Sequence, residues 1–145
     1  MDIQQHIQEI RTFNRFYTDL IGLLDKHLLN SEYSLAEARI LYEIFAAKQL
    51  SASDVICRLS IDKGYLSRIL KKFEKQELIA RVPSKEDARV SLLSLTDAGL
   101  QVFYELNNAS EQQVTDLISC IPVNQLDELV KHMRAITGLL EKRSR

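Results

Sequence analysis

Residues 62–75 of this 145-residue chain combine cations, hydroxyl groups and apolar side chains at helical spacing. Apolar residues recur there at intervals of three and four, which predicts one inward face made of Leu66, Ile69, Leu70 and Phe73. The rest of the surface carries basic and hydroxyl groups, which can bond phosphate oxygens and base edges in a DNA major groove. The candidate DNA contacts on this helix are Lys63, Gly64, Tyr65, Ser67, Arg68, Lys71 and Lys72.

Arg68 is the best candidate for base readout, since one guanidinium can bond both O6 and N7 of guanine. The alternatives are a phosphate contact or an ion pair with Glu74 or Glu77. Tyr65 bonds a phosphate, packs on a thymine methyl group, or is a partly buried structural residue. The lysines of this helix and Lys85 are phosphate contacts or a solvated face.

A second basic element is predicted at the tip of a hairpin, whose strands are residues 79–83 and 89–95. Its polar turn carries Lys85 and Asp87, and Arg89 follows directly. An arginine at a hairpin tip suits a narrow minor groove, where the negative potential is enhanced. The alternative is an ion pair between Arg89 and Asp87, and the two roles are compatible because the carboxylate can aim the guanidinium.

The charge distribution agrees with this placement. The chain has a net charge of -1, but residues 51–96 hold nine basic and six acidic residues, and 63–89 hold eight and four. Residues 1–50 and 97–145 each hold five basic and seven acidic residues. A positive field is therefore confined to one stretch, although a solvated lysine-rich helix face is also common. The rival hypothesis is a winged-helix module that binds protein without sequence-specific DNA binding.

Composition sets the class of protein. Apolar residues make up 46 % and charged residues 27 %, while four Gly and two Pro leave little room for long loops. We expect one mainly helical domain, without a signal peptide or a membrane span, located in the cytoplasm. Cys57 and Cys120 form no disulfide framework, and a redox role of Cys57 has little support. The histidines and cysteines lack the spacing of a metal site, and no catalytic constellation or cofactor loop is present, so we expect no enzyme and no cofactor.

The elements that position these residues can be predicted in order. An amphipathic helix runs from residue 3 to about 29, and its stripe exceeds what its own core can cover. We expect a second subunit to complete it, the alternative being that it folds onto its own chain. A serine with an acid three residues later predicts two further helix starts, at Ser34 with Glu37 and at Ser51 with Asp54.

The first of those two helices ends near Lys48, and Asp62 caps the basic helix. The expected inner face of the helix that Ser34 opens is Leu35, Ala38, Leu41, Tyr42 and Phe45. After the hairpin, Thr96 caps a helix over 97–119, and a last helix runs from Val123 to Lys142 beyond Pro122. Both have large apolar faces suited to pairing with a partner chain.

The segments DKGYLSRILKKFEKQELIAR (62–81) and KEDARVSLLSLTDAG (85–99), in this order of elements, resemble the MarR family of winged helix-turn-helix transcription regulators. The resemblance implies a triangular homodimer whose winged lobes bind a palindromic operator. It places Ser67 and Arg68 at recognition-helix positions that touch phosphate or base edges. It makes Asp87 the wing acid that orients an arginine, and Arg89 the arginine inserted into the minor groove.

The chain departs from the family at Glu77, where many members have glycine to ease a left-handed backbone conformation. The run FNRFYT at 13–18 resembles a branch in which the regulator precedes an acetyltransferase domain, but no acetyl-CoA loop follows here. Family members often bind small aromatic or lipophilic ligands between the dimer helices and the winged lobe. A similar pocket here would be lined by Phe13, Phe16, Tyr17, Tyr42 and Phe45, which otherwise are plain core.

The predicted fold is mainly α with a small β-hairpin wing, a winged helix-turn-helix with long N- and C-terminal dimerisation helices. Residues 1–33 and 97–145 are assigned to dimerisation and 34–96 to DNA binding. The expected function is a homodimeric regulator, a repressor, that binds a palindromic operator and is released by a small effector.

Overall fold

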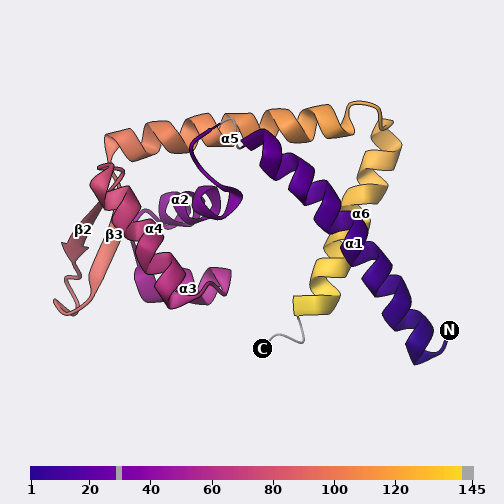
Figure 1. Cartoon of the computed structure of the whole chain (residues 1–145), viewed down its shortest axis with the longest axis horizontal. Helices are drawn as coiled ribbons and strands as arrows, with labels where there is room; N and C mark the ends of the chain where they lie inside the picture. The colour runs from indigo at the N-terminus through magenta and orange to yellow at the C-terminus, as the bar shows by residue number, and fades with distance from the viewer. Residues whose placement is uncertain (29–30, 142–145) are drawn as a thin grey trace. The chain divides into compact units, whose positions relative to one another are not determined.

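A computed structural model describes residues 1–28 and 31–141 of the chain (Figure 1). Its elements are α1 (Ile3–Leu28), α2 (Leu35–Ala47), β1 (Leu50–Ser51), α3 (Ala52–Leu59), α4 (Lys63–Lys75), β2 (Ile79–Pro83), β3 (Ser91–Leu95), α5 (Asp97–Ile118) and α6 (Val123–Glu141). They confirm the predicted fold class. The expected helix ends at residue 29 and Lys142 lie outside the described residues. The chain divides into two compact units, Met1–Ser110 and the part from Glu111 onward.

The predicted helix starts are confirmed by their capping bonds. Ser34 Oγ accepts from the Glu37 amide at 3.2 Å, and the Glu37 carboxylate accepts from the Ser34 amide at 3.1 Å. Ser51 and Asp54 form the same pair of bonds at 3.1 and 3.4 Å. The Asp62 carboxylate accepts from the Tyr65 amide at 3.0 Å. Each cap satisfies amides that a helix start leaves without a partner, and so fixes where the helix begins.

The core of the first unit lies between α2, α3, α4 and the sheet. All four inward residues predicted on α4 are buried: Leu66, Ile69, Leu70 and Phe73. The prediction for α2 was partly wrong. Tyr42 is 52 % exposed, and Ile40 and Ile44, which were left out of the predicted face, are fully buried.

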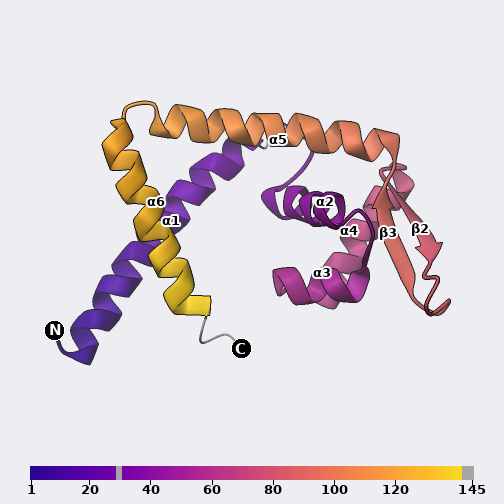
Figure 2. The same ribbon diagram turned by 180° about the vertical axis from the view of Figure 1, so that it is seen from behind.

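The reason is that α2 lies between α3 and the first part of α5 (Figure 2). Phe45 stacks on Phe103 of α5 with ring centroids 4.2 Å apart, and Glu43 pairs with Arg58 of α3 at 3.4 Å. A helix in contact with neighbours on two sides buries more than one stripe.

The sheet is antiparallel with strand order β1-β3-β2, and it includes the two-residue strand β1 that the sequence did not predict. Leu50 pairs with Leu93, and Ile79 pairs with Leu95. The return strand begins at Ser91 rather than at Arg89, because Arg89 belongs to the turn that Asp87 closes. β2 and β3 form the wing, which extends away from the helices of this unit (Figure 1).

The end of α4 is joined to the start of α5 by a close backbone contact. Glu77 adopts a left-handed conformation with φ 59°, and the Leu78 amide reaches back to the Phe73 carbonyl at 2.9 Å. Glu77 thus takes the position at which many family members have glycine, and it keeps the helix-ending geometry that glycine would give. Thr96 Oγ1 donates to the Glu77 carbonyl at 2.6 Å and accepts from the Gly99 amide at 3.0 Å, which confirms Thr96 as the cap of α5.

Gly99 is required at this junction for space. A Cβ atom built on Gly99 would lie 2.0 Å from the Leu78 carbonyl oxygen, closer than any real contact. The LTDAG run is therefore explained by a threonine that bonds the loop after α4 and a glycine that lets this loop approach.

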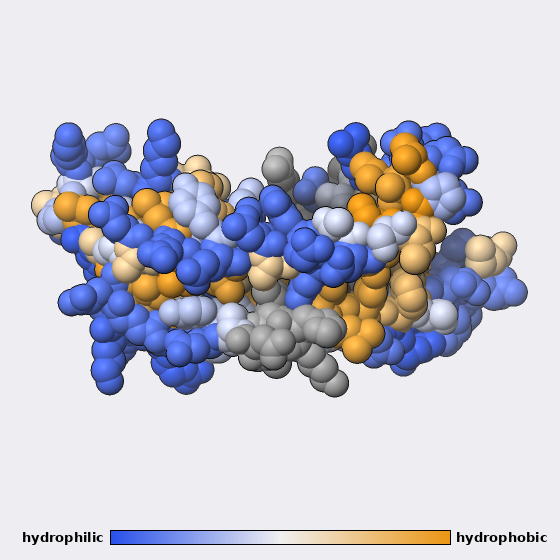
Figure 3. Space-filling model, turned by 90° about the horizontal axis from the view of Figure 1, so that it is seen from above, coloured by the Kyte–Doolittle hydropathy of each residue, from blue (hydrophilic) through white to orange (hydrophobic). Residues whose placement is uncertain are grey.

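Many apolar side chains of the terminal helices are exposed to solvent. Figure 3 shows apolar residues (orange) next to polar residues (blue) on the surface of one face. On α1 the exposed apolar side chains are Ile3, Ile7, Ile10, Phe13, Phe16, Tyr17 and Leu23. The α6 helix buries no described residue, and Val123, Val130, Met133, Ile136, Leu139 and Leu140 are exposed on it. Among the described residues, no helix combines the length and the apolar character that crossing a membrane requires.

Candidate nucleic-acid interface

The α4 helix presents its polar residues on the side away from the core. Lys63, Gly64, Tyr65, Ser67, Arg68 and Lys71 are all exposed, as expected from the spacing of the buried face. At about 100° per residue, Arg68 and Lys71 lie opposite the centre of the buried face. Gly64 also serves the cap, because a Cβ atom there would lie 3.2 Å from the Asp62 carboxylate.

Arg68 is held by an aromatic ring. Its guanidinium carbon lies 5.9 Å from the centroid of the Tyr65 ring. The alternative ion pair with Glu74 is not formed, because Glu74 pairs with Arg81 of β2. This leaves Arg68 exposed without an ion-pair partner among the side chains that the structure describes, and it ties α4 to the wing through Glu74 and Arg81.

Lys72 is placed differently from the other candidate contacts. Its Nζ donates to Glu37 Oε2 at 2.7 Å and lies 5.2 Å from the centroid of the Tyr33 ring. The Glu37 side chain is only 11 % exposed. Moving this ammonium group to DNA would leave a nearly buried carboxylate unpaired. The structure thus gives Lys72 a stabilising role that the sequence did not predict, and its phosphate contact stays a prediction. Sequence reasoning identified Glu37 only as a capping residue and missed this second role.

The wing tip carries the ion pair that the sequence suggested. Arg89 Nε donates to Asp87 Oδ1 at 3.1 Å and Nη2 donates to Oδ2 at 3.2 Å. Hydrogen bonds from the side chain and the amide of Arg89 hold the pKa of Asp87 below its usual value. The Arg89 side chain is 91 % exposed and Lys85 is exposed as well, so both cations are accessible to a ligand while Asp87 sets the direction of Arg89.

Comparison with known proteins identifies the region that carries these cations. A family model described as the MarR family matches residues 33–91. The transcriptional regulator MgrA of Staphylococcus aureus is 29 % identical over 102 residues, which are 70 % of this chain and 65 % of that protein. Residues 33–91, from just before α2 to the start of β3, are thus similar to the MarR family. The match spans less than two thirds of the length of MgrA.

Solved structures of other proteins share the fold. BldR from Sulfolobus solfataricus has a TM-score of 0.77 at 20 % identity, with 95 % of this chain and 98 % of that chain covered. A MarR mutant from E. coli complexed with operator DNA has a TM-score of 0.75 at 20 % identity, with 94 % and 99 % covered. At such identities the likeness establishes the common fold alone.

The aromatic residues expected to form one ligand pocket lie in separate groups. Phe13 and Tyr17 stack on each other along α1 with centroids 5.7 Å apart, and Phe16 is exposed. Tyr42 and Phe45 instead line two different hollows of the first unit. Neither hollow brings the five residues together. Tyr42 and Phe45 lie against Phe103 of α5, whereas Phe13, Phe16 and Tyr17 belong to α1.

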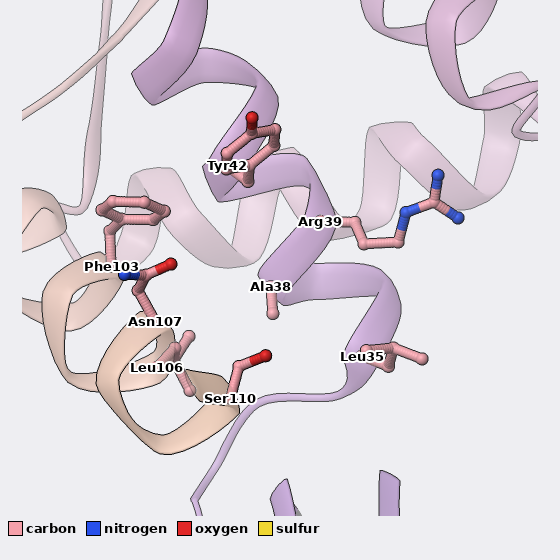
Figure 4. Close-up of a pocket in the computed structure, with 8 residues that line it drawn as sticks. All are labelled: Leu35, Ala38, Arg39, Tyr42, Phe103, Leu106, Asn107 and Ser110. Atoms are coloured by element: carbon pink, nitrogen blue, oxygen red, sulfur yellow. The ribbon is translucent and has the colours of Figure 1, made fainter. Parts of the chain in front are cut away.

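One of these hollows lies between α2 and α5 and has a volume of about 170 Å³ (Figure 4). Tyr42 and Ala38 of α2 face Phe103 and Leu106 of α5 across it, while Arg39 extends away from α5. The complete lining is Leu35, Ala38, Arg39, Tyr42, Phe103, Leu106, Asn107 and Ser110. Besides its apolar side chains, this lining includes the polar residues Arg39, Asn107 and Ser110.

The described residues contain no cluster of three His, Cys, Asp or Glu side chains that could hold a metal ion. Cys57 and Cys120 are exposed free thiols.

Proposed function

We propose that this chain is a homodimeric DNA-binding transcription regulator, a repressor that acts in the cytoplasm on a palindromic operator. The observation that carries the proposal is the surface of α4, where Arg68 and Lys71 are exposed opposite a helix face packed in the core. A helix fixed in this way can enter a major groove without losing its orientation. The names of its relatives support the proposal, since MgrA is called a transcriptional regulator and the E. coli MarR mutant was crystallised with operator DNA.

In this proposal residues 34–96 bind DNA, with α4 in the major groove and the wing in the adjacent minor groove. Lys63, Lys71 and Lys85 contact phosphates, and Arg68 and Arg89 reach base edges. Fluorescence anisotropy with a labelled duplex, selected from a random-sequence library by the full-length protein, tests the assignment.

Affinity is expected to fall steeply with salt, with a log–log slope of about -0.9 for each phosphate contacted. The upstream DNA of the protein's own gene is the natural second probe. A chain that enriches no sequence, and binds DNA with no salt dependence, is a protein-binding module instead.

We further propose that a second copy of the chain covers the exposed apolar residues of the terminal helices. Ile10 is 61 % exposed and Leu139 of α6 is 71 % exposed, and burying such side chains is the dominant favourable contribution to association. Sedimentation equilibrium of the full chain should give a dimer. Ile10→Glu should shift it towards monomer, whereas Gln8→Glu, about 200° around α1, adds the same charge on the other side and should leave the dimer intact.

A two-fold dimer implies a palindromic site. Its recognition helices would read half-sites about one helical turn of DNA apart. Inserting about five base pairs between the half-sites of the selected duplex turns one half-site to the opposite face of the DNA, and binding should fall to that of a single half-site.

Release by a small aromatic or lipophilic effector is the remaining part of the proposal. The hollow lined by Tyr42 and Phe103 is comparable with an apolar cavity of about 150 Å³ that admits benzene. Phenol and benzoate are suitable probes of one ring. Either should raise the melting temperature of the full chain and release the labelled duplex, and Ala38→Phe, which fills the hollow, should abolish both effects. Unchanged melting and binding at millimolar probe would remove the hollow from the proposal.

A further inference from the structure

Arg68, the arginine of α4 proposed to read bases, differs from the other arginines of residues 51–96 in the group that its guanidinium contacts. Residues 51–96 contain four arginines, and three of these pair with a carboxylate. These three are Arg58, Arg81 and Arg89. The fourth, Arg68, has no ion-pair partner among the described residues and instead lies 5.9 Å from the Tyr65 ring centroid.

The two ways of holding an arginine have different consequences for recognition. A carboxylate accepts the in-plane N–H groups of the guanidinium, which are the groups that would bond O6 and N7 of guanine. An aromatic face attracts the cation through its quadrupole and accepts none of these in-plane bonds. A ring therefore restrains Arg68 while its donors stay available.

We propose that Tyr65 is a positioning residue that orders Arg68 for base readout through the face of its ring. This inference rests on the proposed function, because it assigns a cause to the sequence discrimination of the same helix. Holding a long side chain before binding reduces the conformational entropy that binding would otherwise cost.

The position of the Tyr65 ring is itself fixed by the start of α4. The Tyr65 amide donates to the Asp62 carboxylate at 3.0 Å, and Gly64 leaves the space that this cap needs. Tyr65 also lines a hollow together with Arg39 and Ile61, and 38 % of the residue is exposed. The phenol oxygen has no hydrogen-bond partner among the described residues, so the ring and the hydroxyl group can be tested separately.

The test uses the full-length dimer, the duplex selected by the wild-type chain, and duplexes in which single G·C pairs of that site are replaced. The measured quantity is the ratio of affinities for the selected and the replaced duplexes. Tyr65→Ala should reduce this ratio by about 3- to 30-fold at the position that Arg68 reads, since a cation–π contact has that range of strength. Tyr65→Phe keeps the ring and should preserve the ratio.

The double variant with Tyr65→Ala and Arg68→Ala should discriminate no worse than Arg68→Ala alone, because the ring acts only through the arginine. Far-UV circular dichroism should match the wild-type chain in each single variant. Affinity for a scrambled duplex should match it in Tyr65→Ala and in Tyr65→Phe. This separates lost positioning from lost folding.

Three results would overturn the inference: a Tyr65→Ala chain that discriminates like the wild type, additive losses in the double variant, or a Tyr65→Phe chain as poor as Tyr65→Ala. The last result would assign a phosphate contact to the hydroxyl group. If the wild-type chain enriches no sequence at all, the proposed function fails, and this inference fails with it. If the wild-type chain does select a sequence and one of the three results above is found, only this inference fails.

Discussion

Methionine in place of Lys72 keeps most of the apolar length of the side chain but removes the cation that Glu37 faces. The two groups lie 2.7 Å apart in the structure, and their side chains are 39 % and 11 % exposed, respectively. The substitution leaves the Glu37 carboxylate in a nearly dry site with only the Ser34 amide as a charge-stabilising partner among the contacts described. Lys72→Met should therefore destabilise the fold.

The size of the loss follows from the position of the pair between two limits. Removing one member of a fully buried ion pair costs about 3–5 kcal/mol. An exposed pair contributes about 0–1 kcal/mol. Because Glu37 is nearly buried and Lys72 is partly exposed, we expect a loss of about 2 kcal/mol. Lys71→Met is the matched control, since Lys71 is the exposed neighbour on the same helix and should change stability by less than about 0.5 kcal/mol.

The pH dependence has a defined sign. Burial opposes ionisation of Glu37, but hydrogen bonds from Lys72 and Ser34 outweigh it, so the pKa of Glu37 lies below its ordinary value of 4.5. The contribution to stability is complete above pH 4.5 and is lost as the pH falls through the lowered pKa of the folded state. In Lys72→Met, the hydrogen bond and the charge of Lys72 no longer lower the pKa of Glu37, so this pKa is higher than in the wild type. The deficit in the stability of the variant should therefore shrink as the pH falls below 4.5.

Urea unfolding followed by far-UV circular dichroism, at neutral pH and near pH 4, measures both effects. Protein concentration must be held constant because the stability of a dimer depends on it. DNA affinity supplies the second readout: at temperatures where both variants are folded, Lys71→Met should weaken binding and Lys72→Met should not. Equal stability of the two variants, with equal loss of DNA affinity, would refute the assignment of Lys72 to the core.

Three further outcomes are expected at other positions. Glu77→Gly should stabilise the fold by about 0.5–1 kcal/mol in urea unfolding. The left-handed conformation costs glutamate a steric penalty at its Cβ atom, and this penalty exceeds the entropic cost of ordering glycine. Gly99→Ala should lower the free energy of unfolding by about 3 kcal/mol or more, because the new methyl group meets the Leu78 carbonyl. The melting temperature should fall sharply as a result. Arg68→Ala should cost about 1–3 kcal/mol of binding and blur base preference, whereas Lys71→Ala should weaken all duplexes alike and reduce the salt slope by about one, as gel shifts and anisotropy would show.

What the sequence predicted correctly depends on short-range rules. The caps at Ser34, Ser51 and Asp62 each involve a residue three positions away, so the pattern and its cause lie in the same few letters. The buried face of α4 was predictable because its other positions are nearly all polar. For α2 the pattern is ambiguous, since apolar residues lie on every side of it. Its buried face is decided by contacts with Phe103 of α5, far away in the chain.

The ion pair of Lys72 was not predicted, and the reason is geometric. Lys71 and Lys72 are identical in type and adjacent in sequence, but at about 100° per residue they leave the helix in different directions. Lys72 lies at the flank of the buried face, and Lys71 lies nearly opposite it. The partner Glu37 is 35 positions earlier in the chain. A helical wheel would have shown that Lys72 lies at the flank of the buried face. Only the fold shows that the Glu37 carboxylate lies next to it.

The ion pairs of this domain differ in whether their cation can exchange its carboxylate for DNA, and burial of the pair determines this. The pair of Arg89 and Asp87 is open to water, so it contributes little to stability and a phosphate or a narrow minor groove can compete for the arginine. The pair of Lys72 and Glu37 cannot be exchanged for DNA in this way, because separating it leaves a charge in the core. The pair of Arg81 and Glu74 joins β2 of the wing to α4, and both of its side chains are partly exposed. Counting the basic residues of 63–89 alone therefore overstates the number available to DNA, since some of those cations stabilise the surface that the others present.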